Sequence, residues 1–150
     1  MTLYENEKRV CARGITFIDD DILLIERHKK ENERVLHYFT IPGGGVDVGE
    51  TYEDAAVRET LEETTVKTKV VKFLKKEEFE TGIVYWYLLE YISGTPKLGG
   101  EELERNNADN HYKVVLKNIK EINDLPILGE GKQIIKNVLN EVMENDKKEK

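Results

Sequence analysis

The sequence predicts one α/β or α+β domain in which helices cover both faces of a mixed sheet. Strand-like apolar runs occupy much of residues 10–93 and return at 112–116. Two helical patterns, at 51–63 and 134–143, are separated by strands. At 150 residues, with no linker or internal repeat, the chain is expected to form a single domain over residues 1–150.

The first 41 residues carry three strand patterns. Residues 10–17 alternate in polarity, Asp19–Asp21 signals a turn, and residues 22–25 are apolar, which together predict a hairpin. Residues 27–34 are almost all charged and predict a solvated loop. Residues 35–41 then return to a strand pattern.

A glycine cluster and a helix follow. Gly43 to Gly45 are predicted to form a loop whose backbone approaches a ligand closely. The helix spans residues 51–63, with Glu50 or Thr51 at its N-terminal boundary. At about 100° per residue, the helix has two distinct faces. The face expected to pack on the sheet comprises Ala56, Val57, Thr60 and Leu61. The opposite, acidic face comprises Ala55, Glu59, Glu62 and Glu63.

The second half of the chain predicts further strands and a final helix. Residues 66–79 and 81–93 are strand-like, and the aromatic and β-branched residues of 83–92 favour a central strand. A long polar loop at 94–110 leads to a strand at 112–116. After a break at 124–126, the last helix carries an amphipathic stripe of Ile134, Ile135, Val138, Leu139, Val142 and Met143, and a charged tail at 145–150 is expected to fray.

Composition limits the possible partners. The net charge of -7 argues against DNA and weighs against RNA, because nucleic-acid-binding surfaces are usually basic. No apolar run approaches the roughly 20 residues that a membrane span needs. The single cysteine, Cys11, excludes an intrachain disulfide, so a reducing, cytoplasmic setting is expected. A homodimer is possible, although no sequence feature specifies its interface.

Three carboxylates on the first helix suggest metal chemistry. Glu59, Glu62 and Glu63 stand at positions i, i+3 and i+4, where they repel one another unless a cation lies between them. Mg²⁺ and Mn²⁺ bind carboxylate oxygens beside substrate phosphates and can lower the pKa of a bound water. The alternative is a solvated acidic face on a surface helix.

The spacing of the glycines and acids carries a family resemblance. From Gly44 the chain reads Gly, five residues, Glu50, seven residues, Arg58-Glu59, two residues, Glu62-Glu63, two residues, Val66. These 23 residues resemble the Nudix box of the Nudix (MutT-like) hydrolases. Two positions depart from that pattern.

The resemblance implies a fold, a reaction and a set of roles. The fold would be an α/β/α sandwich, and the reaction would hydrolyse a nucleoside diphosphate linked to another moiety with Mg²⁺ or Mn²⁺. Metal ligands would be Glu59, Glu62, Glu63 and the carbonyl of Gly43. Arg58 would orient the carboxylates, with Glu50 as its partner.

The general base and the substrate contacts are less closely defined. Glu59 is the base candidate within the box; a carboxylate of the 94–110 loop is the alternative, with Glu102 foremost beside Glu101 and Glu104. Substrate contacts are expected from Arg13, Arg27, Gly44 and Gly45, although both arginines could equally be surface charges. A small nucleotide or a nucleotide sugar is the expected substrate; nucleoside triphosphates, ADP-ribose, dinucleoside polyphosphates and capped RNA all remain open.

A different class of function is also compatible with the resemblance. A catalytically silent module that senses nucleotides or binds a partner could use the same fold. The intact acidic cluster favours the enzyme.

The two departures are both threonines. Thr60 stands where an aliphatic residue is usual, so its hydroxyl needs a partner if it is buried. Thr65 replaces the glycine that ends the helix. Because a β-branched residue disfavours a left-handed cap, a different helix ending is expected.

Overall fold

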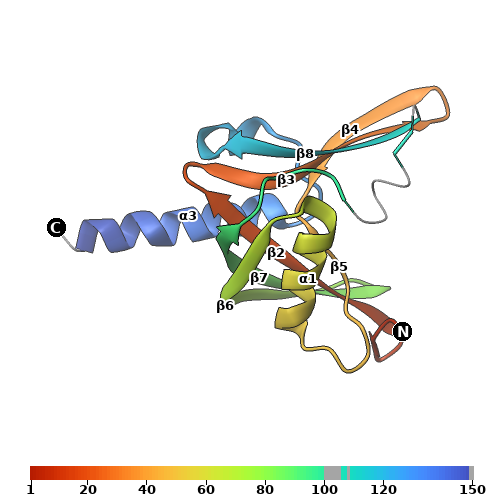
Figure 1. Ribbon diagram of the computed structural model, residues 1–150, viewed down its shortest axis with the longest axis horizontal. Helices are drawn as coiled ribbons and strands as arrows, with labels where there is room; N and C mark the ends of the chain where they lie inside the picture. The colour runs from red at the N-terminus through yellow and green to blue at the C-terminus, as the bar shows by residue number, and fades with distance from the viewer. Residues whose placement is uncertain (100–105, 108, 149–150) are drawn as a thin grey trace.

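The computed structural model describes residues 1–99, 106–107 and 109–148 and shows a mixed eight-stranded sheet with helices on both faces (Figure 1). In chain order the elements are β1 Tyr4–Glu5, β2 Lys8–Ile18, β3 Asp21–Glu31, β4 Arg34–Thr40, β5 Gly43–Gly45, α1 Tyr52–Thr64, β6 Lys67–Glu78, β7 Gly82–Ser93, β8 Asn110–Asn118, the 3₁₀ helix η1 Ile119–Asp124 and α3 Gly131–Lys148. The predicted fold class is confirmed.

The sheet is built around β2 and β7. Its main order is β4-β3-β2-β7-β6, with β1 and β5 paired to β2 and β8 paired to β3. The pairing of β2 with β7 is parallel and the other strand pairs are antiparallel. The strand predicted to be central, β7, therefore lies between β2 and β6.

Two apolar cores lie on opposite sides of this sheet. Helix α1 buries Ala55 and Ala56 on one side, with Val10, Ala12, Val46, Tyr87 and Leu89 of the strands and the loop before the helix. Helix α3 buries Ile134 and Ile135 on the other, with Ile15, Ile22, Leu24, Phe39, Ile41, Val84, Trp86, Ile122 and Ile127. The alternating pattern of β2 supplies residues to both cores.

The charged segment 27–34 is not a loop, as was predicted, but the outer part of a β-hairpin. Strand β3 continues to Glu31, β4 begins at Arg34, and Asn32 and Glu33 alone turn the chain with positive φ values of 47° and 70°. Pairing with β4 on one edge and β8 on the other satisfies the backbone of β3. The hairpin projects from the body of the domain (Figure 1), where solvent accommodates its charged side chains.

The glycine cluster also forms a strand instead of the predicted loop. Gly43 to Gly45 pair antiparallel with residues 11–13 of β2. Glycine is needed here for close approach: a Cβ on Gly43 would lie 2.5 Å from the carbonyl oxygen of Ala12. A Cβ on Gly44 would lie 2.7 Å from the carboxylate of Glu59.

Helix α1 is rotated relative to the predicted faces. Thr51 is its N-cap, with Oγ1 accepting a hydrogen bond of 3.1 Å from the backbone N–H of Asp54. Ala55, expected on the acidic face, is fully buried, whereas Leu61, expected to anchor the helix, is 44% exposed. The small alanine allows the helix to approach the sheet closely, and the rotation carries Glu63 to the buried side.

The end of α1 contradicts the expectation at Thr65. Thr65 adopts the left-handed conformation (φ 60°, ψ 15°), and its backbone N–H donates to the carbonyl of Leu61. Its hydroxyl donates to the carbonyl oxygen of Thr95 at 2.7 Å. The following residue, Val66, is fully buried, so tertiary packing holds the chain in a turn that a threonine disfavours by itself.

The last helix continues further than expected. The predicted break lies between η1 and α3, but the backbone of α3 runs to Lys148 where a frayed tail from Asn145 was predicted. Ile134, Ile135 and Val138 of the predicted stripe are buried, and Val142 is exposed.

Replacing Thr60 by valine is expected to stabilise the domain. The Oγ1 atom of Thr60 is buried and has no hydrogen-bond partner within the described part of the chain. Removing this unsatisfied group in Thr60→Val should raise the free energy of unfolding by about 1 kcal/mol in urea denaturation. The control is Thr64→Val, which should lower it, because the hydroxyl of Thr64 donates to the carbonyl of Thr60 at 2.6 Å. Equal effects of the two variants would contradict this account.

Thr65→Gly is expected to raise the free energy of unfolding by about 1 kcal/mol, because glycine adopts the left-handed conformation without the steric cost of a β-branched side chain. Thr65→Val keeps that cost and removes the hydrogen bond to Thr95, so it should lower stability. Thermal unfolding of the three proteins measures the order. A destabilised glycine variant would show that the hydroxyl contact outweighs the strain.

Candidate active site

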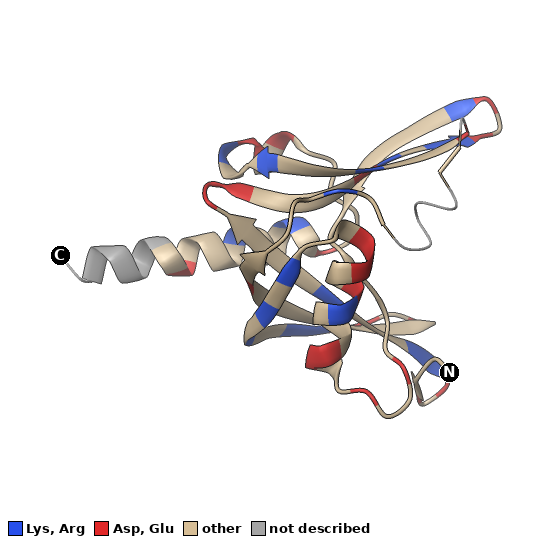
Figure 2. Ribbon diagram, viewed as in Figure 1, with Lys and Arg blue, Asp and Glu red and all other residues tan. Residues whose placement is uncertain are grey.

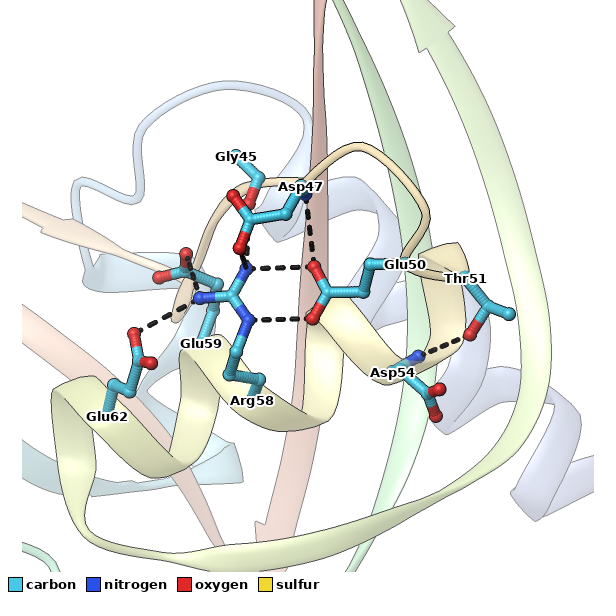
Figure 3. A network of polar contacts seen from close by, with 8 residues as sticks. All are labelled: Gly45, Asp47, Glu50, Thr51, Asp54, Arg58, Glu59 and Glu62. Carbon is cyan, nitrogen blue, oxygen red and sulfur yellow. Dashed lines mark hydrogen bonds and ion pairs between the residues drawn. The ribbon is translucent and has the colours of Figure 1, made fainter. Parts of the chain in front are cut away.

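The guanidinium of Arg58 organises the acidic end of α1 (Figure 3). It binds Glu50 through two hydrogen bonds, Nε to Oε2 at 2.7 Å and Nη2 to Oε1 at 3.0 Å. The predicted partner is therefore the partner observed. Glu50 lies in the loop before the helix, so this bidentate pair ties the loop to the helix surface.

The remaining donors of Arg58 reach three further groups. Nη1 donates to Glu59 Oε1 at 3.0 Å and to Glu62 Oε2 at 3.2 Å. Nη2 also donates to the carbonyl oxygen of Gly45 at 3.0 Å. All five N–H donors of the guanidinium are thereby directed at the glycine strand, the loop and the helix.

These contacts shift the pKa values of Glu50 and Arg58 in the directions that keep both side chains charged. The hydrogen bonds from Arg58 hold the pKa of the Glu50 carboxyl below its usual range. The carboxylates of Glu50 and Glu59 in turn raise the pKa of Arg58 above its ordinary value. Arg58 and Glu50 are therefore held in their charged forms.

The three predicted metal-binding acids occupy different environments. The side chain of Glu59 is 16% exposed and lies against Gly44, and that of Glu62 is 52% exposed. Glu63 is only 6% exposed and lines a neighbouring cavity. Figure 2 shows acidic residues along α1 on both sides of one basic position. The carboxylates of the helix therefore range from buried, at Glu63, to exposed, at Glu62.

A cavity of about 350 Å³ lies beside this helix. Its lining combines three arginines with one acid: Arg9, Arg13 and Arg27 with Glu63, together with Ile25, Thr40, Gly43, Tyr112 and Leu128. Sequence reasoning proposed Arg13 and Arg27 but not Arg9. The period-two alternation of β2, which places residues 9 and 13 on one face, was the signal that could have found it.

The arginines of the cavity are held in place by other groups. Arg27 Nη2 donates to Asn110 Oδ1 at 3.0 Å and to the hydroxyl of Tyr112 at 2.8 Å, and its Cζ lies 4.3 Å from the Tyr112 ring centroid. Its Nε is buried and has no hydrogen-bond partner among the residues described. Arg13 Nη1 donates to the carbonyl of Ile41 at 2.7 Å. An oriented cation that lines a cavity suits an anionic ligand.

The other predicted positions divide into three groups. Gly43 lines the cavity, whereas Gly44 and Gly45 lie against Glu59 and Arg58. The alternative bases Glu101, Glu102 and Glu104 lie outside the described residues. The residues that could hold a divalent cation offer carboxylate and carbonyl oxygens, the donors that Mg²⁺ and Mn²⁺ prefer, so the predicted set fits these ions.

Comparison with known proteins identifies the class of domain. The sequence model of the NUDIX domain matches residues 8–116, most of the chain. The chain therefore belongs to the NUDIX domain family. Its fold is similar to that of a NUDIX hydrolase from Nitrosomonas europaea (TM-score 0.67, 17% identity, covering 89% of each chain). It is also similar to a MutT NUDIX hydrolase from Burkholderia pseudomallei (TM-score 0.66, 24% identity, 87% of this chain and 98% of that one).

Two curated relatives differ in their names. An ADP-ribose pyrophosphatase of Methanocaldococcus jannaschii is 35% identical over 106 residues, 67% of this chain and 61% of the relative. An NAD-capped RNA hydrolase NudC of Photorhabdus laumondii is 31% identical over 86 residues, 56% of this chain and 32% of the relative. The chain thus spans less than two thirds of the length of these relatives. Within the part of the chain described, the structure holds no helix that combines the length and apolarity of a membrane span.

Glu50→Gln is expected to lower the free energy of unfolding by about 2 kcal/mol at pH 7, because it breaks a partly buried bidentate ion pair. The pKa of Glu50 is lowered by folding, so its stabilisation is complete above the unfolded value of about 4.3 and is lost as the pH falls through the folded value. Urea denaturation from pH 7 to pH 3 should therefore show the two proteins converging below about pH 4.

The control is Glu90→Gln, which removes an ion pair with Lys69 between two well-exposed side chains. It should change stability little at any of these pH values. A pH-independent gap between Glu50→Gln and the wild type would contradict the assigned role.

Proposed function

We propose that this domain is a metal-dependent pyrophosphohydrolase that cleaves a nucleoside diphosphate linked to another moiety. The observation that supports this most strongly is the arrangement of acids on α1: Arg58 holds Glu59 and Glu62, and Glu63 of the same helix lines a cavity containing three arginines. Acids for divalent cations and arginines for phosphate oxygens thus meet at one site. Membership of the NUDIX domain family supports the same reaction class.

The proposed roles follow the environments of the acids. Glu59, Glu62 and Glu63, with the carbonyl of Gly43, would hold Mg²⁺ or Mn²⁺, which supplies charge neutralisation and acidifies a bound water. Arg58 is a positioning residue, since its donors are occupied by the acids and by Gly45.

The general base is proposed to be Glu59. Its carboxylate is held by Arg58 and lies against the glycine strand. Water attack on phosphorus would break one P–O bond of the anhydride and give two phosphate products. Glu102 is the alternative base, with Glu101 and Glu104 beside it in the sequence.

The substrate is proposed to place its diphosphate among Arg9, Arg13 and Arg27. Arg27 lines the cavity, and Asn110 and Tyr112 orient its guanidinium, so it offers a fixed positive charge to a phosphate group. ADP-ribose is the first candidate, because the relative named ADP-ribose pyrophosphatase matches two thirds of this chain. An NAD-capped RNA is the second, on the name of the NudC relatives, but the net charge of -7 opposes RNA binding.

The setting proposed for this reaction is cytoplasmic. The one cysteine, Cys11, cannot form an intrachain disulfide, which fits a reducing compartment. A small nucleotide is the proposed partner.

The reaction can be tested on a panel of ADP-ribose, nucleoside triphosphates, dinucleoside polyphosphates and NAD-capped RNA, with Mg²⁺ or Mn²⁺. We expect release of a nucleoside monophosphate or phosphate from at least one member. Glu59→Gln and Glu62→Gln should lower kcat by about 10²- to 10⁴-fold. Glu90→Gln should leave it unchanged, because this exposed residue belongs neither to the cavity lining nor to the contacts of Arg58.

If the domain is instead a catalytically silent module, it should hydrolyse no member of this panel. Absence of turnover on every member, with Glu62→Gln binding ligands as the wild type does, would sink the enzyme hypothesis. In that case calorimetry with the same nucleotides identifies the bound ligand directly.

A further inference from the structure

The three histidines of the chain lie in one row across three neighbouring strands. His28 of β3 is directly opposite His37 of β4 and directly opposite His111 of β8. Directly paired residues of antiparallel strands project from the same face of a sheet. A chain with only three histidines therefore places all of them on one face of the sheet region formed by β3, β4 and β8.

This face is the reverse of the one that borders the cavity. Arg27 lies between Glu26 and His28, and its guanidinium stands over the rings of Tyr38 and Tyr112. Alternation along β3 directs Glu26 and His28 to the other side. The histidine row is thus separate from the Arg58 cluster and from the three arginines.

Three side chains of this face converge closely. The Nε2 atom of His37 is 2.7 Å from Oε2 of Glu26, and the rings of His28 and His37 stack with centroids 4.3 Å apart and planes 6° from parallel. One ligand atom from each of Glu26, His28 and His37 falls within 4.8 Å of the other two. Each residue belongs to a strand whose backbone is paired, so the donor set is built on rigid elements.

We propose that Glu26, His28 and His37 form a second cation site, selective for a borderline transition metal such as Zn²⁺. Two imidazoles and one carboxylate are the donors that Zn²⁺, Cu²⁺ and Ni²⁺ prefer, whereas Mg²⁺ favours oxygen alone. Ligand atoms around a tetrahedral Zn²⁺ stand about 3.4 Å apart, given bond lengths near 2.05 Å. Rotamer adjustment of the two exposed histidines closes the remaining distance, and water completes the coordination.

Calorimetric titration of the full chain with Zn²⁺ tests this site, with Mg²⁺ in excess to occupy the carboxylates of α1. The wild type is expected to bind one equivalent tightly. Loss of an outer-sphere partner weakens metal binding by roughly 10- to 100-fold. Because His28 and His37 would be direct ligands, His28→Gln and His37→Gln should each weaken Zn²⁺ binding by more than that. His111→Gln is the matched control: the same substitution in the same row, outside the group of three, should keep the tight site.

A ring-selective NMR spectrum provides a second readout on the unaltered protein, so the test does not depend on any variant folding. Zn²⁺ should shift the ring signals of His28 and His37 and leave those of His111 in place. The proposal is overturned if Zn²⁺ fails to bind, if only His111 responds, or if the His28→Gln, His37→Gln double variant binds as tightly as the wild type.

The test is independent of the proposed hydrolase activity, because it measures metal binding alone on the opposite face of the hairpin. Zn²⁺ should also raise the Tm of the wild type and not that of the double variant, since a ligand that binds the folded state stabilises it.

Discussion

The interaction on which the site depends is the set of hydrogen bonds made by Arg58. One guanidinium joins a loop carboxylate, two helix carboxylates and the carbonyl of Gly45. Without it, the acids of α1 would repel one another and the loop before the helix would lose its attachment. Because arginine stays charged and offers donors in a fixed plane, it imposes one geometry on flexible glutamates, which a lysine would not do.

A second constraint is the absence of side chains at Gly43 and Gly44. The strand β5 lies so close to β2 and to Glu59 that even a Cβ would collide. This closeness brings the carbonyl of Gly45 within reach of Arg58 and places Gly43 in the wall of the cavity. The glycines therefore act through their size, and neither a loop nor a left-handed conformation is required of them.

The strands and helices followed from local patterns where burial dominates. Three elements could be predicted from sequence: β2 from its alternating polarity, β7 from its many aromatic and β-branched residues, and α3 from its apolar stripe. In each, the positions of the apolar side chains indicate which face packs on the core. The charged hairpin could not be predicted from its composition. Its outer part is a strand because β3 pairs with β4 on one edge and with β8 on the other. Thr65 was misread for a related reason: packing of the neighbouring Val66 outweighs the local preference of a β-branched residue.

By itself, the sequence determined the family, and it predicted the acids of the candidate site and the Arg58–Glu50 partnership, because these rest on residue types at short, fixed spacings. Only the tertiary structure decided which acid is buried, that Arg9 joins Arg13 and Arg27 around one cavity, and that the three histidines form a row. These residues are brought together by strand pairing between segments far apart in the sequence, such as β3 and β8, where Arg27 contacts Tyr112 85 positions away. A linear pattern carries no record of such pairings, so the composition of the cavity emerges only when the sheet is assembled.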